Sequence, residues 1–231
     1  MKFKFFFIIV LPVFLLFSCS STVSSFDKSK KILSNNYLSG NSIAIYDGIN
    51  DSSFVKLTDF SSDFIFDMKY ATEDNFLKSK VYDCEECYLR LKTIKNLIQA
   101  NEEFKALGYQ IKIFDCYRPL DVQKKMWEIM PNADYVANPA RGSIHNRGGA
   151  IDITLVDAKG KELEMGTDFD FFGLEASHNY ANSSKKVKQN RLLLKSIMLK
   201  HNFKSFDSEW WHYNLNDSTK DKIANFKWEC P

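Results

Sequence analysis

Residues 143–152 read SIHNRGGAID, which sets a histidine seven residues before an aspartate. The apolar run that follows, 151–156, alternates with a period of two and is rich in β-branched residues, which predicts a strand. The glycine pair before it allows the chain to fold back, so that His145 can approach Asp152. A strand would hold the side chain of Asp152 stiffly, as a metal ligand requires.

Imidazole nitrogens and carboxylate oxygens are good zinc ligands, and a catalytic zinc takes about three protein ligands plus a water. His145 and Asp152 would supply two of these ligands. Spacing alone leaves open whether a loop histidine and a strand aspartate meet at all. A third ligand must therefore come from another part of the chain.

Among the 4 histidines, His212 is the best candidate for that ligand, because it lies in an aromatic segment expected to be buried. A histidine in such a place is more often a packed core residue. Glu209, three residues earlier, favours a site, because a carboxylate is needed to take a proton from the attacking water. Glu209 and His212 would face opposite sides of a straight strand, so this hypothesis requires a bend or bulge.

The first residues of the chain predict export. Residues 1–19 combine two early lysines with an apolar stretch at 5–17, which is too short to span a membrane. The stretch ends in LFSC and resembles a bacterial lipobox, in which Cys19 would become the lipidated first residue. The alternative is an ordinary secretory signal cut nearby. We interpret 20–40 as a flexible tether and 41–231 as the folded domain.

The length of 231 residues fits one domain, and the net charge of +2 with both signs interspersed gives no indication of a nucleic-acid partner. The remaining cysteines are Cys84, Cys87, Cys116 and Cys230. In an exported chain they predict disulfides, with three pairings open. Half of a zinc knuckle at Cys84 and Cys87 is the alternative, although no second CxxC exists.

Periodicity predicts strands and helices in blocks. We expect extended segments near 43–46, 54–57, 64–70, 109–114 and 151–156, a return at 162–165, and an aromatic segment at 203–213. We expect helices at 89–107, 121–130 and 185–202. This order favours an α+β domain with a central, mostly antiparallel sheet flanked by helices.

The whole pattern resembles a known family. Ser143-x-His145-x-x-Gly148-x-Ala150-x-Asp152 followed by Glu209-x-x-His212 is similar to the zinc D-Ala-D-Ala metallopeptidases of peptidase family M15, which have a hedgehog-like fold. The segments 70–76, 115–119, 165–170 and 209–213 resemble the VanX-type D-alanyl-D-alanine dipeptidases. The similarity extends from about Phe64 to Tyr213.

The resemblance implies a role for each matching residue. One Zn²⁺ would be bound by His145, Asp152 and His212. Glu209 would act as general base and then as acid, and Arg118 would stabilise the oxyanion. Substrate contacts would come from Ser143, Asp170 and Tyr70, the first two at the free amino end. Without the resemblance, Arg118 would be interpreted as a surface salt bridge and Asp170 as a turn residue.

Two features depart from the family pattern. VanX-type enzymes are described as soluble and cytoplasmic, whereas this chain carries an export signal, and its cysteines lie outside the pattern. We expect a membrane-anchored lipoprotein of the bacterial envelope that meets D-Ala-D-Ala or related peptides released from the wall. The alternatives are a D,D- or L,D-carboxypeptidase or endopeptidase on peptidoglycan stems, and a non-catalytic cell-wall-binding lipoprotein.

Overall fold

The computed structural model describes residues 46–133 and 135–230. The chain divides into two units, Met1–Asp47 and Gly48–Pro231, and every helix and strand described below belongs to the second. The predicted signal segment, Cys19, the tether and nearly all of the extended segment at 43–46 lie outside the described residues. Within the described residues, no helix is long and apolar enough to cross a membrane.

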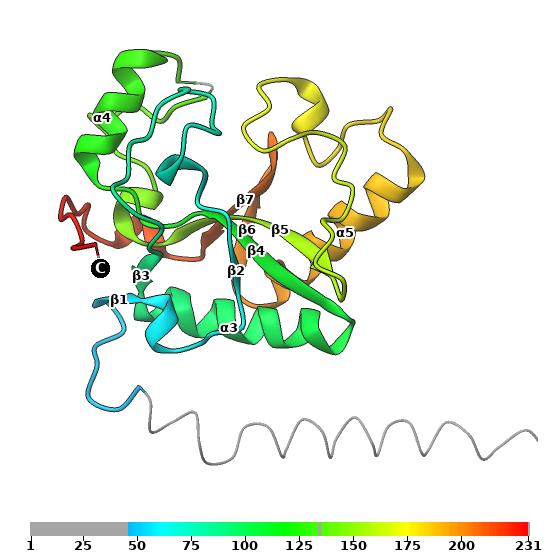
Figure 1. Cartoon of the computed structure of the whole chain (residues 1–231), viewed down its shortest axis with the longest axis horizontal. Coiled ribbons are helices and arrows are strands. Elements are labelled where there is room, and N and C mark those ends of the chain that lie inside the picture. The colour runs from blue at the N-terminus through cyan, green and yellow to red at the C-terminus, as the bar shows by residue number, and fades with distance from the viewer. Residues whose placement is uncertain (1–45, 134, 231) are drawn as a thin grey trace, which may run out of the picture. The chain divides into compact units, whose positions relative to one another are not determined.

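A mixed sheet runs through the centre of the domain (Figure 1). Within the described residues it has five strands in the order β2-β4-β5-β7-β6. Their bounds are β2 Ile65–Phe66, β4 Tyr109–Asp115, β5 Ala150–Asp157, β7 Glu209–Leu215 and β6 Phe203–Phe206. β2 is parallel to β4 and the other pairings are antiparallel. A smaller antiparallel sheet pairs β1 (Phe54–Lys56) with β3 (Tyr88–Arg90).

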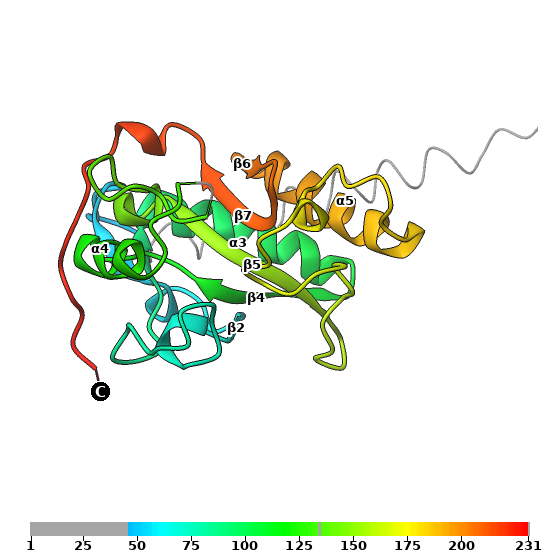
Figure 2. The same cartoon turned by 90° about the horizontal axis from the view of Figure 1, so that it is seen from above.

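Helices cover both sides of the central sheet. Their bounds are α3 Leu91–Ala106, α4 Leu120–Ile129 and α5 Lys185–Lys200. α3 packs on β4 and on α5, and α5 packs on β6. Figure 1 shows α3 below the sheet and α4 above it, and Figure 2 shows the same layers from above. The α+β architecture with a mostly antiparallel sheet is therefore confirmed.

The strand β5 lies at the centre of this arrangement and is buried from Ala150 to Val156. Ile151, Ile153 and Leu155 belong to the hydrophobic core, as their alternation predicts. The other face of the strand carries Asp152 and is buried as well, so helices and loops cover both faces.

Three element boundaries differ from the predictions. The helix expected from residue 89 begins at Leu91, because Tyr88–Arg90 pairs with β1. The strand expected over 64–70 shortens to β2, because Lys69–Ala71 forms a 3₁₀ helix, η2. The return expected over 162–165 is reduced to one bridge between Val156 and Glu162 and a bond from Leu163 N–H to the Leu155 carbonyl.

The predicted disulfides are confirmed, and the structure selects one of the pairings. In the described part of the chain, Cys84 is bonded to Cys230 and Cys87 to Cys116. The zinc-knuckle alternative is wrong, because the two neighbouring cysteines have different partners. Cys87 and Cys116 are buried, whereas Cys230 is exposed.

Candidate active site

A row of polar side chains crosses three strands of the central sheet. Asp152 on β5 is the register partner of His212 on β7. A register shift after Ile113 places Asp115, the last residue of β4, opposite Asp152 on the other side. Side chains that are register partners in an antiparallel pair lie close together on one face. The sheet therefore brings Asp152 and His212 together although 60 residues separate them.

His145 reaches the same place from η3 (His145–Arg147), the 3₁₀ turn just before β5. Gly148 ends this turn at φ +68°, and a Cβ there would lie 2.2 Å from the ring of Phe54. A Cβ on Gly149 would lie 2.3 Å from Ser218. Only glycine fits both positions, and the fold-back predicted from the sequence follows: His145 Nε2 is 3.4 Å from Asp152 Oδ2.

The bend that Glu209 and His212 require is present in β7. Ser205 on β6 pairs with Tyr213, while its neighbour Phe206 pairs with Glu209, so the intervening residues of β7 bulge. The bulge turns both side chains toward the same region. Glu209 Oε2 lies 4.0 Å from His212 Nδ1.

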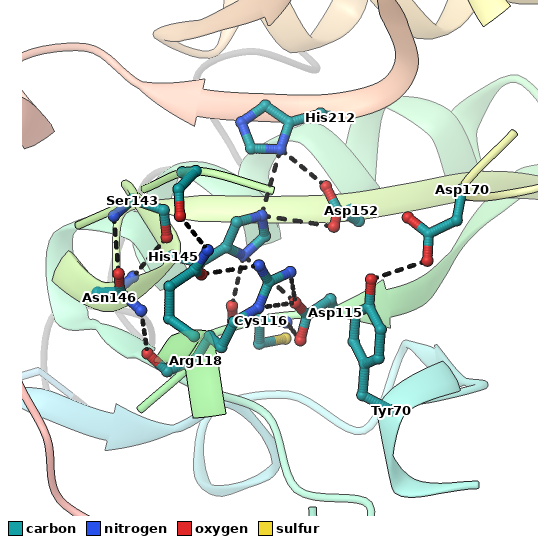
Figure 3. Close-up of polar contacts among 12 residues, drawn as sticks. Tyr70, Asp115, Cys116, Arg118, Ser143, His145, Asn146, Asp152, Asp170 and His212 are labelled. Atoms are coloured by element: carbon teal, nitrogen blue, oxygen red, sulfur yellow. Dashed lines mark hydrogen bonds and ion pairs between the residues drawn. The ribbon is translucent and has the colours of Figure 1, made fainter. Parts of the chain in front are cut away.

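Three ligand atoms converge at the centre of the row (Figure 3). Nε2 of His145 is 3.2 Å from Nδ1 of His212, which is 2.9 Å from Oδ1 of Asp152. The remaining ring nitrogens have acceptor partners: His145 Nδ1 donates to the Cys116 carbonyl at 2.7 Å, and His212 Nε2 donates to Asn214 Oδ1 at 3.0 Å. With these acceptors on the outer nitrogens, each imidazole in its neutral form presents a lone pair on its inward nitrogen.

These residues fit a metal ion. Two lone pairs and a carboxylate face one another, so either a proton or a cation must lie between them. Zinc ligands at ordinary bond lengths in a tetrahedral arrangement lie about 3.3 Å apart. The two ring nitrogens are 3.2 Å apart, and each lies close to a different oxygen of Asp152, His212 Nδ1 at 2.9 Å from Oδ1 and His145 Nε2 at 3.4 Å from Oδ2, which is near that spacing. His145, Asp152 and His212 thus form a group that could hold a metal ion, as predicted.

Burial and mutual attraction act in opposite directions on this group. Burial alone would raise the pKa of Asp152, but the imidazoles of His145 and His212 lower it overall, so the carboxylate stays ionised. Burial lowers the pKa of His212, and the hydrogen bond and charge of Asp152 outweigh it and raise that pKa. Burial raises the pKa of Glu209, which favours proton uptake there.

Arg118 forms a buried ion pair beside the metal group. Its Nη2 and Nε donate to Asp115 Oδ2 at 2.6 and 3.2 Å, and its Nη1 donates to Gln123 at 3.0 Å. Asp115 is fully buried and Arg118 is 8% exposed, so the surface salt bridge interpretation is wrong. Hydrogen bonds within the described residues occupy three of the five guanidinium N–H groups, which leaves two for a ligand.

Asp170 and Tyr70 lie at the other end of the site (Figure 3). The Tyr70 hydroxyl donates to Asp170 Oδ2 at 2.7 Å, and Asp170 adopts a left-handed backbone with φ +56°. Burial is the main cause that raises the pKa of Asp170 well above its ordinary value, and the Tyr70 bond only partly offsets it. The expectation from local sequence that Asp170 is a plain turn residue misses this contact.

All the predicted catalytic, substrate-binding and metal-ligating residues line one cavity of ≈ 300 Å³. Ser143 belongs to it, and its hydroxyl accepts a 3.3 Å bond from the Asn146 N–H. The aromatic walls are Phe76, Tyr135, Phe206 and Trp211. The assigned roles of these residues stay predictions.

The sequence reasoning missed several residues that hold the predicted ones in place. Asn146 is fully buried, and its amide bonds the Arg118 carbonyl at 2.7 Å. Asn214 could have been found, because a residue two positions after His212 shares its strand face. Asp115 begins the segment 115–119 that resembles the VanX-type enzymes, but the sequence alone indicates no role for it.

Comparison with known proteins identifies the family of this chain. The family model for Peptidase_M15, described as D-ala-D-ala dipeptidase, matches residues 50–229. A D-alanyl-D-alanine dipeptidase of Escherichia coli is 35% identical over 180 residues, which cover 78% of this chain and 93% of that protein. One from Enterococcus faecium is 35% identical over 174 residues, covering 66% of this chain and 86% of that protein.

Among solved structures, the vancomycin-resistance D,D-pentapeptidase VanY in complex with Zn(II) matches with a TM-score of 0.37 and 15% identity, over 58% of this chain and 78% of that one. The family match and the two dipeptidase relatives cover most of the domain that carries the site. The chain therefore belongs to the Peptidase_M15 family of D-alanyl-D-alanine dipeptidases.

Proposed function

We propose that this chain is a zinc-dependent dipeptidase that hydrolyses D-alanyl-D-alanine in bacterial cell-wall metabolism. The observation that carries the proposal is the convergence of two imidazole nitrogens and one carboxylate, from His145, His212 and Asp152. The carboxylate of Glu209 lies 4.0 Å from His212 Nδ1. When bound, zinc would lower the pKa of water and polarise the scissile carbonyl.

The residues around the metal group then have distinct tasks. Glu209 accepts a proton at its carboxylate and returns it to the leaving amine, a task that its raised pKa suits. Arg118 offers its two free N–H groups to the oxygen on which negative charge develops. Asp115 holds that guanidinium in a fixed orientation through two bonds.

The far end of the cavity suits the free amine of a dipeptide. Asp170 lines the cavity, and its carboxylate would pair with a substrate ammonium. Tyr70 and Ser143 would fix the orientation of that end. A carboxypeptidase or endopeptidase binds a chain without a free amine at this point, so a carboxylate in this place favours the dipeptide.

A panel of substrates tests this function. Zinc-loaded protein is incubated with D-Ala-D-Ala, its N-acetylated form and a stem pentapeptide, and the products are separated by chromatography. We expect cleavage of the free dipeptide at a kcat/KM at least tenfold above the other two. Preferential cleavage of the pentapeptide would establish the carboxypeptidase alternative, and no cleavage of any substrate by zinc-bound protein would establish the binding-protein alternative.

We further propose that Cys19 anchors the enzyme in the cell envelope, on the grounds of the lipobox-like LFSC sequence. Each buried CH₂ of an acyl chain contributes about 0.8 kcal/mol, and two chains are needed for stable binding. Cys19→Ala should therefore move the protein from the membrane pellet to the supernatant after cell fractionation. Continued pelleting of this variant would contradict the anchor.

A further inference from the structure

A buried disulfide lies next to His145, one of the proposed metal ligands. Cys116 follows the last residue of β4, and its side chain is bonded to Cys87. Cys116 is 0% exposed and Cys87 1%. The proposed reaction leaves this bond without a role.

Both main-chain polar groups of Cys116 serve the site. Its N–H donates to Asp115 Oδ1 at 2.9 Å, and its carbonyl accepts the 2.7 Å bond from His145 Nδ1 (Figure 3). The partner of one ring nitrogen decides which nitrogen keeps its lone pair. The position of the Cys116 carbonyl therefore decides that His145 presents Nε2 to the metal group.

The disulfide ties that carbonyl to the smaller sheet. Cys87 immediately precedes β3, and its own carbonyl accepts a 2.9 Å bond from Leu57 N–H, just after β1. Cys116 lies beyond the last register pair of β4, so the ladder to β5 does not hold it. A main-chain bond from Tyr117 N–H to the Tyr88 carbonyl at 3.0 Å supports the same junction.

We propose that the Cys87–Cys116 disulfide is a positioning element of the metal centre, which fixes the Cys116 carbonyl and through it the tautomer and direction of His145. This inference rests on the proposed function, because it takes His145 as a zinc ligand. Groups that orient a metal ligand typically contribute 10–100-fold to metal affinity. We expect the lower end here, because the Tyr117–Tyr88 bond remains.

The second disulfide is a matched control. Cys84 and exposed Cys230 join the C-terminal segment to the domain, and Figure 2 shows this segment running past α4. Among the main-chain hydrogen bonds of the described residues outside helices and strands, none links either cysteine to His145, Asp152 or His212. The segment keeps other contacts without the bond, such as the stacking of Phe226 on Tyr117 at 4.5 Å.

The experiment compares Cys87→Ala/Cys116→Ala with Cys84→Ala/Cys230→Ala in the full chain. Alanine is used rather than reduction, because free thiolates would themselves bind zinc. Zinc affinity is measured by competition with a chromophoric chelator. The imidazole tautomer of His145 is measured by ¹⁵N NMR on zinc-free protein.

We expect the first variant to bind zinc about tenfold more weakly and to show mixed His145 tautomers, with both properties unchanged in the second. Cys87→Val/Cys116→Ala refills the volume of the two sulfurs and should weaken zinc binding equally, which separates the lost bond from a lost fold. Unchanged affinity and tautomer in a folded variant would overturn the inference. Retained zinc affinity in His145→Ala would instead overturn the proposed metal site.

Discussion

The two ends of the cavity are built in different ways. At the metal end, Asp152 and His212 are register partners on adjacent strands, and His145 is fixed by a main-chain carbonyl. At the other end, which would bind the substrate's free amine and is called the amino end below, Tyr70 lies on η2 and Asp170 lies between β5 and α5. One side-chain hydrogen bond joins these two residues. Strands thus position Asp152, His212 and Glu209 at the metal end, a 3₁₀ turn adds His145, and irregular segments position the group that would select the substrate.

The two ends also act in opposite ways on the pKa of a carboxylate, that of buried Asp152 and that of half-buried Asp170. The pKa of Asp152 is lowered in spite of burial, because two imidazoles face it. The pKa of Asp170 is raised by burial, and its hydrogen-bond partner is an uncharged phenol. The metal end therefore holds its charge permanently, whereas the amino end gains full stabilisation of its charge only when a cation arrives.

The largest effect should follow from removing the proton carrier at the metal end. Glu209→Gln keeps the shape of the side chain but cannot accept a proton, so kcat should fall by about 10²–10⁴-fold. Zinc should stay bound, because Glu209 is not one of the converging ligands. The measurement is kcat at matched zinc content. Retention of more than about a tenth of the wild-type kcat would remove Glu209 from the mechanism.

A second substitution tests the electrostatic helper. Arg118→Lys keeps the positive charge but loses the planar fork that bonds Asp115 and Gln123. We expect kcat to fall by about 10²–10³-fold with a smaller change in KM, the size typical of losing one oxyanion donor. A rise in KM alone would move Arg118 from transition-state stabilisation to substrate binding.

The difference between the two ends also explains what the sequence could predict. The period of two in the strand after His145 predicts which face carries Asp152, and the glycine pair allows His145 to approach it, but spacing alone leaves open whether the two side chains meet. From the sequence, a bulge in β7 could be stated only as a condition for Glu209 and His212 to share a face. Its position could not be predicted, because it depends on how β6 pairs with Glu209 and Tyr213.

The end of the cavity that would bind the substrate amine, at Tyr70 and Asp170, could not be predicted from local sequence. Tyr70 and Asp170 are 100 residues apart and share no strand, so only the family resemblance suggested that they act together. The roles of Asp115 and the Cys116 carbonyl depend on a register shift and a disulfide, which no pattern of polar and apolar residues encodes.

A third prediction separates the amino end from the metal end. Asp170→Asn should raise KM for free D-Ala-D-Ala by about 10–100-fold, the value of a hydrogen bond to a charged group, and should affect an N-acetylated substrate less. Because the pKa of Asp170 is raised, KM of the wild type should increase as pH falls through that pKa, and the variant should lose this dependence. If KM of the wild type and of Asp170→Asn depended on pH in the same way, the substrate amine would not bind at Asp170.

The smallest effect concerns the stability of Asp170→Asn: the substitution that weakens substrate binding should stabilise the fold. The pKa of Asp170 is higher in the folded protein than in the unfolded chain, so the stability of the wild type declines as pH rises from about 4 through the folded pKa. Asparagine tolerates the left-handed backbone at φ +56° and carries no charge. Asp170→Asn should therefore be more stable than the wild type at neutral pH by ~1 kcal/mol, or about 2–4 °C in Tm, and equally stable near pH 3.5.

Asp168→Asn, an exposed position in the same segment, is the matched control and should show no such gap. Calorimetry of the three proteins across pH measures the difference, and a gap that stays constant with pH would mean that burial of the Asp170 carboxylate costs the fold nothing.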